Sequence, residues 1–171
     1  MAFRENRSNW KSHSDPVLRP PGVCMKSHSD PLLPVAFRWR TRVYWEDTDA
    51  GGVVYHAGYL RFLERARTEW MRAMAMGQDA LRRSHGIVFV VRELSIAYDK
   101  PARLDDELDS TVRVGRLRSA SMDIAQDVLR AADGVTLARA QVRIACVDAE
   151  AFVPRRIPSN IAELIQGHNF E

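Results

Sequence analysis

Hydrophobic residues follow helical spacing in one long segment of the chain. Across residues 58–76, apolar side chains recur three or four positions apart and broaden into more than one face. At roughly 1.5 Å per residue, such a helix spans about 28 Å, the width of a small domain. Gly77 is expected to end it, and a shorter helix over residues 78–84 is expected to close at Gly86. The pattern therefore predicts a long helix with apolar neighbours on several sides.

Strand periodicity precedes and follows these helices. Residues 40–46 are rich in aromatic and β-branched side chains and predict a strand. From Ile87 onward apolar positions alternate, and their parity changes near Arg92 and Glu93, which predicts a bulge. A terminal helix is expected over 157–166. Three further alternating runs, joined by short turns, predict an antiparallel meander, and they cover residues 108–114, 122–128 and 138–146.

This order of elements predicts an α+β fold in which one curved antiparallel sheet wraps the long helix. The first 36 residues are polar, punctuated by prolines and without periodicity, so residues 1–36 are expected to form a disordered extension. Residues 37–171 suffice for one core, and we expect a single domain there. The sequence KSHSDPVL at 11–18 nearly recurs at 26–33, directly after Met25. Met25 as the natural start and a duplicated tail without function are both consistent with this repeat.

Charge and cysteine content argue against several classes of protein. The net charge of +3 comes from 25 basic and 22 acidic residues that interleave, whereas nucleic-acid-binding proteins concentrate Lys and Arg on one face. Cys24 and Cys146 lie far apart without metal-ligand spacing, so we expect no metal and a buried Cys146 thiol. The sequence also lacks a run of about 18 apolar residues. We therefore expect a cytoplasmic protein that binds no nucleic acid and does not insert stably into membranes.

Candidate chemistry is concentrated in residues 47–59, which combine carboxylates, a glycine pair, a histidine and the start of the long helix. The first N–H groups of a helix lack intrahelical partners and can polarise a carbonyl or stabilise an oxyanion. Asp49, brought back by the glycine turn, can attack a carbonyl carbon or activate a water beside it. Alternatively, Asp49 is an ordinary turn residue and His56 a structural, hydrogen-bonded histidine.

A family resemblance is carried by residues 42–70, which read RVYWEDTDAGGVVYHAGYLRFLERARTEW. This segment closely resembles the 4-hydroxybenzoyl-CoA thioesterase family, and within it the bacterial subfamily linked to the Tol–Pal envelope system. Shorter matching blocks extend the similarity over residues 37–158. They are FRW at 37–39, FVVR at 89–92, PARLDD at 101–106, Gln126 and CVD at 146–148.

The resemblance implies a hotdog fold, a homodimer or homotetramer, and hydrolysis of acyl-CoA without metal or organic cofactor. It places the catalytic aspartate at Asp49, not Asp47. It also makes His56 catalytic through its backbone N–H, which is expected to help polarise the thioester carbonyl, while the His56 side chain is characteristic of the subfamily. Tyr55, Gly58 and Tyr59 are expected to contact the substrate around the helix start. Gly58 departs from the pattern, because many relatives have Asn there; only a backbone contribution from this position is expected.

Other residues admit two interpretations. Glu64 is a rival catalytic carboxylate, because some hotdog thioesterases use an acid from the central helix, but helical spacing favours surface ion pairs of Glu64 and Glu69 with nearby arginines. Arginines around the first meander turn are candidates for the coenzyme A phosphates, although charged strand edges also serve to prevent aggregation. These arginines are Arg113, Arg116 and Arg118.

The sequence is also consistent with two alternatives to an acyl-CoA thioesterase. One is a binding module for acyl-carrier protein or envelope-assembly partners with little turnover. The other is a hotdog dehydratase, which the context of His56 does not match. The acyl group is not specified by the sequence, although the resemblance favours aliphatic over aromatic chains.

Overall fold

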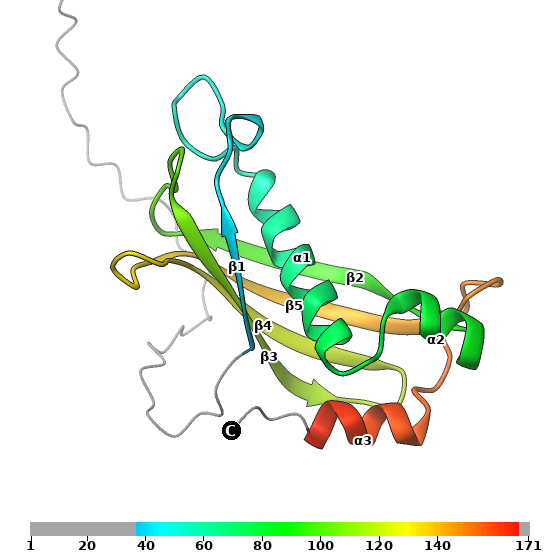
Figure 1. Ribbon diagram of the computed structural model, residues 1–171. Coiled ribbons are helices and arrows are strands. Elements are labelled where there is room, and N and C mark those ends of the chain that lie inside the picture. The colour runs from blue at the N-terminus through cyan, green and yellow to red at the C-terminus, as the bar shows by residue number, and fades with distance from the viewer. Residues whose placement is uncertain (1–36, 168–171) are drawn as a thin grey trace, which may run out of the picture. The chain divides into compact units, whose positions relative to one another are not determined.

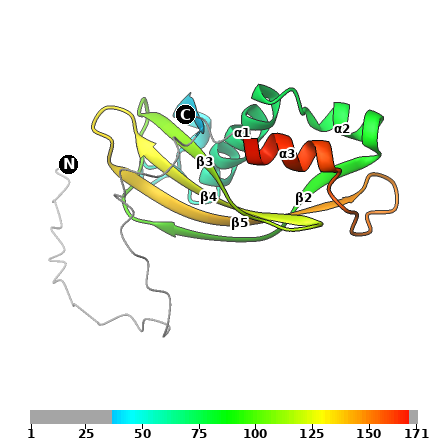
Figure 2. The same ribbon diagram turned by 90° about the horizontal axis from the view of Figure 1, so that it is seen from below.

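In the computed structural model, which describes residues 37–167, five antiparallel strands form one sheet and the helices lie against one of its faces (Figures 1 and 2). The spatial order β1-β3-β4-β5-β2 leaves β1 and β2 as the edge strands. The strands are β1 (Phe37–Arg42), β2 (Ile87–Tyr98), β3 (Glu107–Leu117), β4 (Ser121–Arg130) and β5 (Thr136–Asp148). The helices are the 3-10 turn η1 (Trp45–Asp47), α1 (Gly58–Ala73), α2 (Gln78–His85) and α3 (Ser159–Gly167).

Helix α1 crosses the sheet and contacts β1, β3 and β4. Its apolar side chains recur at helical spacing and therefore form one stripe along the helix, which is buried against the strands. One charged residue shares this face: Arg67 is 8% exposed and donates to the Gln126 side-chain oxygen at 2.6 Å. Gln126 in turn donates to the carbonyls of Leu63 and Thr111, both at 3.1 Å, which joins α1 to β3 and β4. Burial lowers the pKa of Arg67.

The predicted end of the long helix is wrong by several residues. Helix α1 ends at Ala73, before Gly77, and Ala75 takes the left-handed conformation with φ 55°. The Met76 N–H donates to the Met71 carbonyl and the Ala75 N–H to the Arg72 carbonyl, both at 2.9 Å. The Met76 side chain is buried, so apolar packing and this terminal hydrogen bonding outweigh the usual preference for glycine.

The first strand also differs from its predicted extent. Strand β1 covers Phe37–Arg42 and not 40–46, and η1 follows it. The Asp47 carboxylate accepts a hydrogen bond from the Tyr44 N–H at 3.0 Å, which turns the chain away from the sheet. The aromatic and β-branched composition of residues 40–46 favoured a longer strand, because composition gives no sign of this local side-chain hydrogen bond.

The remaining elements follow the predictions closely. A register shift between Val91 and Glu93 confirms the bulge in β2, and β3, β4 and β5 pair as the predicted meander. Gly86 closes α2 with φ 60°, and Cys146 is fully buried. The α+β architecture is therefore confirmed. The predicted extension, with Cys24 and Met25, lies outside the described residues, so the domain boundary stays a prediction.

Candidate active site

The segment between η1 and α1, residues 48–57, is the site loop (Figure 1). A bridge between Thr48 and Val54 pinches its base. The Gly52 N–H donates to the Asp49 carbonyl at 3.0 Å, and Gly52 has φ +71°, a conformation that L side chains rarely adopt. The glycine-containing turn therefore reverses the chain, and the Asp49 N–H donates to the Val53 carbonyl at 3.0 Å.

The Asp49 carboxylate is exposed and is held by its own turn. The Gly51 N–H donates to Oδ1 at 2.8 Å, and no cation of the described residues forms an ion pair with it. A Cβ atom at position 51 would lie 3.0 Å from the same Oδ1, so a side chain there would displace the carboxylate. The turn thus orients Asp49 without neutralising its charge, as a base or nucleophile requires.

Asp47, two residues earlier, lies in a different environment. It is 3% exposed, its Oδ2 accepts the Tyr44 N–H, and its carbonyl accepts the Tyr55 N–H at 2.9 Å. These bonds hold the ends of the site loop together. The position of Asp47 is that of a structural residue, which agrees with the choice of Asp49 as the candidate catalyst.

Helix α1 begins without a side-chain cap. The Gly58 N–H donates to the Tyr55 carbonyl at 2.7 Å, whereas the N–H groups of His56 and Ala57 donate no hydrogen bond within residues 37–167. Unpaired N–H groups at the positive end of a helix can stabilise a developing negative charge. The start of α1 therefore offers the N–H groups of His56 and Ala57, whereas the Gly58 N–H, from which a backbone contribution was expected, is already engaged by the Tyr55 carbonyl.

Aromatic rings surround His56. Its imidazole packs on the Tyr55 ring at 4.4 Å between centroids and on the Tyr98 ring at 6.4 Å. The Tyr98 hydroxyl donates to the His56 carbonyl at 2.8 Å. Sequence reasoning missed Tyr98, because it lies 42 residues away on β2 and its place at the end of an alternating run gave no functional signal.

Tyr59 faces the core and not the solvent. It is 3% exposed, and its hydroxyl accepts the Ala102 N–H at 2.9 Å. Only the backbone of Tyr59 is therefore available for contact with a substrate. Burial raises the pKa of Tyr59. The Ala102 carbonyl accepts the Val54 N–H at 2.9 Å, which attaches residues 99–106 to the site loop. Gly58 is also buried, with room for an added Cβ at ordinary contact distance from its neighbours.

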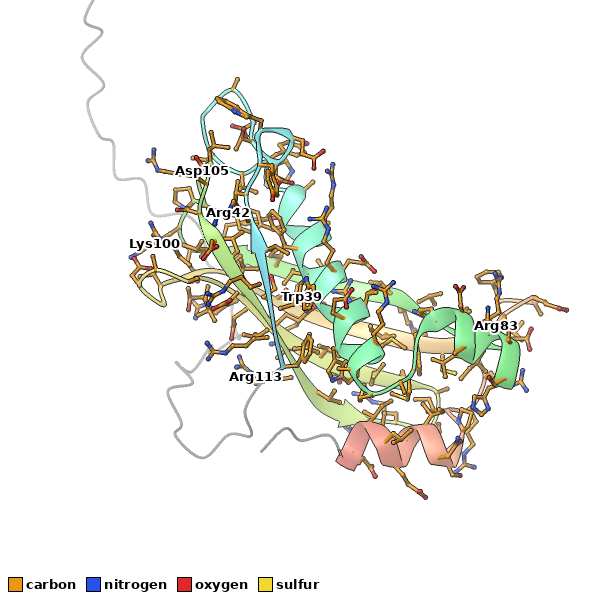
Figure 3. The ribbon with its side chains drawn as sticks, viewed as in Figure 1. Trp39, Arg42, Arg83, Lys100, Asp105 and Arg113 are labelled. Carbon is orange, nitrogen blue, oxygen red and sulfur yellow. The ribbon has the colours of Figure 1, made fainter. Side chains whose placement is uncertain are left out.

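Residues 99–106 carry two exposed cations beside the site. The side chains of Lys100 and Arg103 form no ion pair with other described residues. At one end of β1 the Arg42 guanidinium donates to the Asp105 carbonyl at 3.1 Å, whereas Arg113 lies near the other end of β1 (Figure 3). Arg113 is paired with Asp127, so its charge is already neutralised.

The remaining candidates are mostly engaged in surface interactions. Arg118 pairs with Asp123 at 2.8 Å, and Arg116 is exposed on β3. Glu64 is exposed and accepts the Thr68 hydroxyl at 2.6 Å, whereas Glu69 forms the predicted ion pair with Arg72. Glu64 therefore lies on the surface of α1 within a local hydrogen bond.

Metal ligands and membrane spans are also absent from the part of the chain that the structure describes. It contains no group of three or more His, Cys, Asp or Glu side chains placed to hold a metal ion. None of its helices has both the length and the apolar character needed to cross a membrane.

Comparison with known proteins decides the family. The model of the thioesterase-like superfamily matches residues 43–165, which include the site loop, all of α1 and the sheet from β2 to β5. The chain belongs to this superfamily. The predicted recognition as a thioesterase and the predicted hotdog fold are thereby confirmed.

Relatives of this thioesterase carry informative names. The acyl-CoA thioester hydrolase YbgC of Escherichia coli O6:H1 is 45% identical over 125 residues, which cover 73% of this chain and 92% of the relative. The acyl-CoA thioesterase YbgC of Haemophilus influenzae is 41% identical over 130 residues, which cover 76% and 94%.

Solved structures agree with this assignment. A probable thioesterase from Bartonella henselae superposes with a TM-score of 0.67 at 36% identity, covering 72% of this chain and 100% of the other. A 1,4-dihydroxy-2-naphthoyl-CoA thioesterase from Synechocystis gives a TM-score of 0.73 at 20% identity, covering 80% and 100%. The second likeness shows the fold alone. The predicted enzyme class, a thioester hydrolase, is confirmed.

Proposed function

We propose that the protein hydrolyses acyl-CoA to a free carboxylic acid and coenzyme A. Asp49 acts as general base or nucleophile, and the start of α1 polarises the thioester carbonyl. The observation that carries the proposal is the exposed Asp49 carboxylate, oriented by the Gly51 N–H and followed along the chain by the unpaired N–H groups of His56 and Ala57. The activity named for the YbgC relatives supports acyl-CoA as the substrate.

In the general-base route, Asp49 takes a proton from water while the water oxygen attacks the thioester carbon. The carbonyl oxygen becomes an oxyanion and accepts hydrogen bonds from backbone N–H groups at the start of α1. Collapse of this intermediate breaks the carbon–sulfur bond, and the departing thiolate takes the proton back from Asp49. In the nucleophilic route, a carboxylate oxygen of Asp49 attacks the same carbon, and the carbon–sulfur bond breaks to release coenzyme A as the thiolate. Water then hydrolyses the resulting anhydride, which gives the free acid, restores the Asp49 carboxylate and supplies the proton for the thiolate.

The side chains near the site suggest how the substrate is held. Lys100 and Arg103 are exposed cations beside the site loop, suited to the phosphates of coenzyme A. Replacing both by Ala is expected to raise KM about fivefold, the scale of two exposed ion pairs, with a smaller effect at high salt. Arg83→Ala, on α2 away from this site in Figure 3, is the matched control. An unchanged KM in the double variant would remove these residues from the binding site.

We further propose that the protein is a homo-oligomer built on a dimer. Strand β2 is an edge strand, and Val91 and Tyr98 on its helix-facing side are 49% and 45% exposed. An edge strand with exposed apolar side chains favours pairing with a second copy of the chain. Light scattering is expected to give a mass of at least two chains, and a monomer at assay concentration would contradict this. A homotetramer, a cytoplasmic location and the Tol–Pal association remain predictions of the family resemblance.

The function is tested by thiol release from a panel of aliphatic and aromatic acyl-CoAs, with wild type and Asp49→Asn. Wild type is expected to turn over at least one substrate, and Asp49→Asn to lose at least about a hundredfold in kcat, the scale of a general base. Circular dichroism checks that the variant is folded. If wild type releases no thiol from any substrate, the alternative of a module that binds acyl-carrier protein or envelope partners replaces the enzyme.

A further inference from the structure

We propose that Tyr98 is a positioning residue for this hydrolysis. Its hydroxyl holds the His56–Ala57 peptide in the orientation that keeps the Ala57 N–H available to the thioester oxygen. The inference rests on the proposed function. It adds the Ala57 N–H as a second backbone donor, and it adds Tyr98 as the side chain, distant in sequence, that orients this donor.

The argument begins with the geometry of one peptide unit. The Tyr98 hydroxyl donates to the His56 carbonyl oxygen at 2.8 Å. In a trans peptide, the carbonyl and the following N–H lie in one plane and point in opposite directions; the described residues contain no cis peptide bond. Fixing the His56 carbonyl therefore fixes the direction of the Ala57 N–H, which points away from Tyr98. This N–H has no hydrogen-bond partner among the described residues.

The preceding peptide unit has the same arrangement but a different anchor. The Tyr55 carbonyl accepts the Gly58 N–H at 2.7 Å, and the N–H of the same peptide, that of His56, is unpaired within residues 37–167. Two consecutive peptides thus have an anchored carbonyl and a free N–H. A hydrogen bond to a carbonyl also polarises the amide and strengthens its N–H as a donor. The first unit is anchored by the loop itself, whereas the second depends on Tyr98.

Tyr98 is well placed for this task because the sheet holds it. It is the last residue of β2 and pairs in register with Ala138 of β5. Its ring packs against that of Tyr59 at 5.4 Å between centroids. Burial raises the pKa of Tyr98, so its hydroxyl remains protonated and able to donate throughout the neutral range. A rigid strand therefore orients a peptide of the more exposed site loop.

The test compares Tyr98→Phe with Tyr44→Phe. Both changes remove one hydroxyl and keep the ring, but Tyr44 is 60% exposed and its hydroxyl has no partner among the described residues. Tyr98→Phe is expected to lower kcat about five- to tenfold, the scale of one neutral hydrogen bond, with KM changed less than about twofold. Tyr44→Phe is expected to match wild type. The substrate is the most rapidly hydrolysed acyl-CoA of the panel.

A spectroscopic measurement on the free protein reports the same bond without catalysis. In ¹⁵N-labelled protein, the Ala57 amide nitrogen is expected to move upfield in Tyr98→Phe, because its peptide is no longer polarised, and to stay in place in Tyr44→Phe. The same spectra show whether each variant is folded.

The outcomes separate this inference from the proposed function. If wild type is active and Tyr98→Phe matches it in kcat, or if the Ala57 resonance does not move, the positioning role is overturned and the hydrolase assignment stands. An equal loss in Tyr44→Phe also overturns it. If wild type hydrolyses no acyl-CoA, the proposed function fails and the inference fails with it. A selective loss of kcat in Tyr98→Phe together with the shifted resonance supports the positioning role.

Discussion

The two ends of helix α1 are built in opposite ways. At its C-terminal end, the N–H groups of Ala75 and Met76 return to carbonyls of the last turn, and the Met76 side chain is buried. At its N-terminal end no side chain caps the helix, and the N–H groups of His56 and Ala57 are unpaired within the described part of the chain. The closed end stabilises the fold, whereas the open end retains the donors that the proposed reaction needs.

This contrast shows that the missing cap is not a defect of a marginal helix. The body of α1 is fixed to the sheet through buried apolar residues and through the contacts between Arg67 and Gln126. Packing of this kind supplies most of the stability of helices in proteins. The start of α1 can therefore keep unpaired N–H groups without fraying, and changes in the two regions should affect different measurements.

The largest expected effect on stability comes from the body of α1. Gln126→Leu leaves the Arg67 guanidinium without its acceptor and the carbonyls of Leu63 and Thr111 without this donor. Losing the partner of a buried charge is expected to lower the free energy of unfolding by about 3 kcal/mol. Urea denaturation measures the free energy of unfolding, and Gln141→Leu at an exposed position of β5 is the matched control. Equal stabilities of the two variants would refute the role of this network.

A smaller effect is expected in the site loop, on rate more than on stability. Gly51→Ala brings a Cβ to 3.0 Å from the Asp49 Oδ1, so the carboxylate must shift. Misplacement of the catalytic group is expected to lower kcat about tenfold. Gly77→Ala, where an added Cβ has no neighbour within 4 Å, is the control in steady-state kinetics. If Gly51→Ala keeps the wild-type kcat, the orientation of Asp49 by this turn does not matter.

The smallest expected effect is a gain of stability at the closed end. Ala75 has φ 55°, a conformation that glycine adopts without the steric cost of a Cβ. After the greater entropy of glycine in the unfolded chain is subtracted, Ala75→Gly is expected to stabilise the protein by about 0.5 kcal/mol. Thermal unfolding checks the sign, and kcat should stay unchanged. A clear loss of stability would show that the conformation of Ala75 carries no strain.

Periodicity predicted the elements of this fold well because they are long and their apolar stripes are regular. It predicted the central helix, the bulge beside Glu93 and the meander. It misplaced the ends of α1 and β1, where one buried methionine and one Asp47 hydrogen bond decide the outcome. Such single contacts depend on tertiary packing and leave no period in the sequence.

The candidate site was predicted only where it is continuous in the chain. Asp49 and His56 lie in one short segment, and the family resemblance distinguished Asp49 from Asp47. Tyr98 comes to His56 only through the folding of β2, so nothing local marks it. Tyr59 lies within the apolar pattern of the long helix, and its side chain is buried accordingly.

The most direct test compares Asp49→Asn with Asp47→Asn by kcat on acyl-CoA and by Tm. Asp49→Asn is expected to lose at least about a hundredfold in kcat with an unchanged Tm, because its carboxylate is exposed and acts chemically. Asp47→Asn is expected to lower Tm by about 3 °C, because the Tyr44 N–H then donates to a neutral amide oxygen, a weaker acceptor than the buried carboxylate. If Asp49→Asn keeps kcat within about threefold of wild type, Asp49 is not the catalytic carboxylate and the proposed mechanism is wrong.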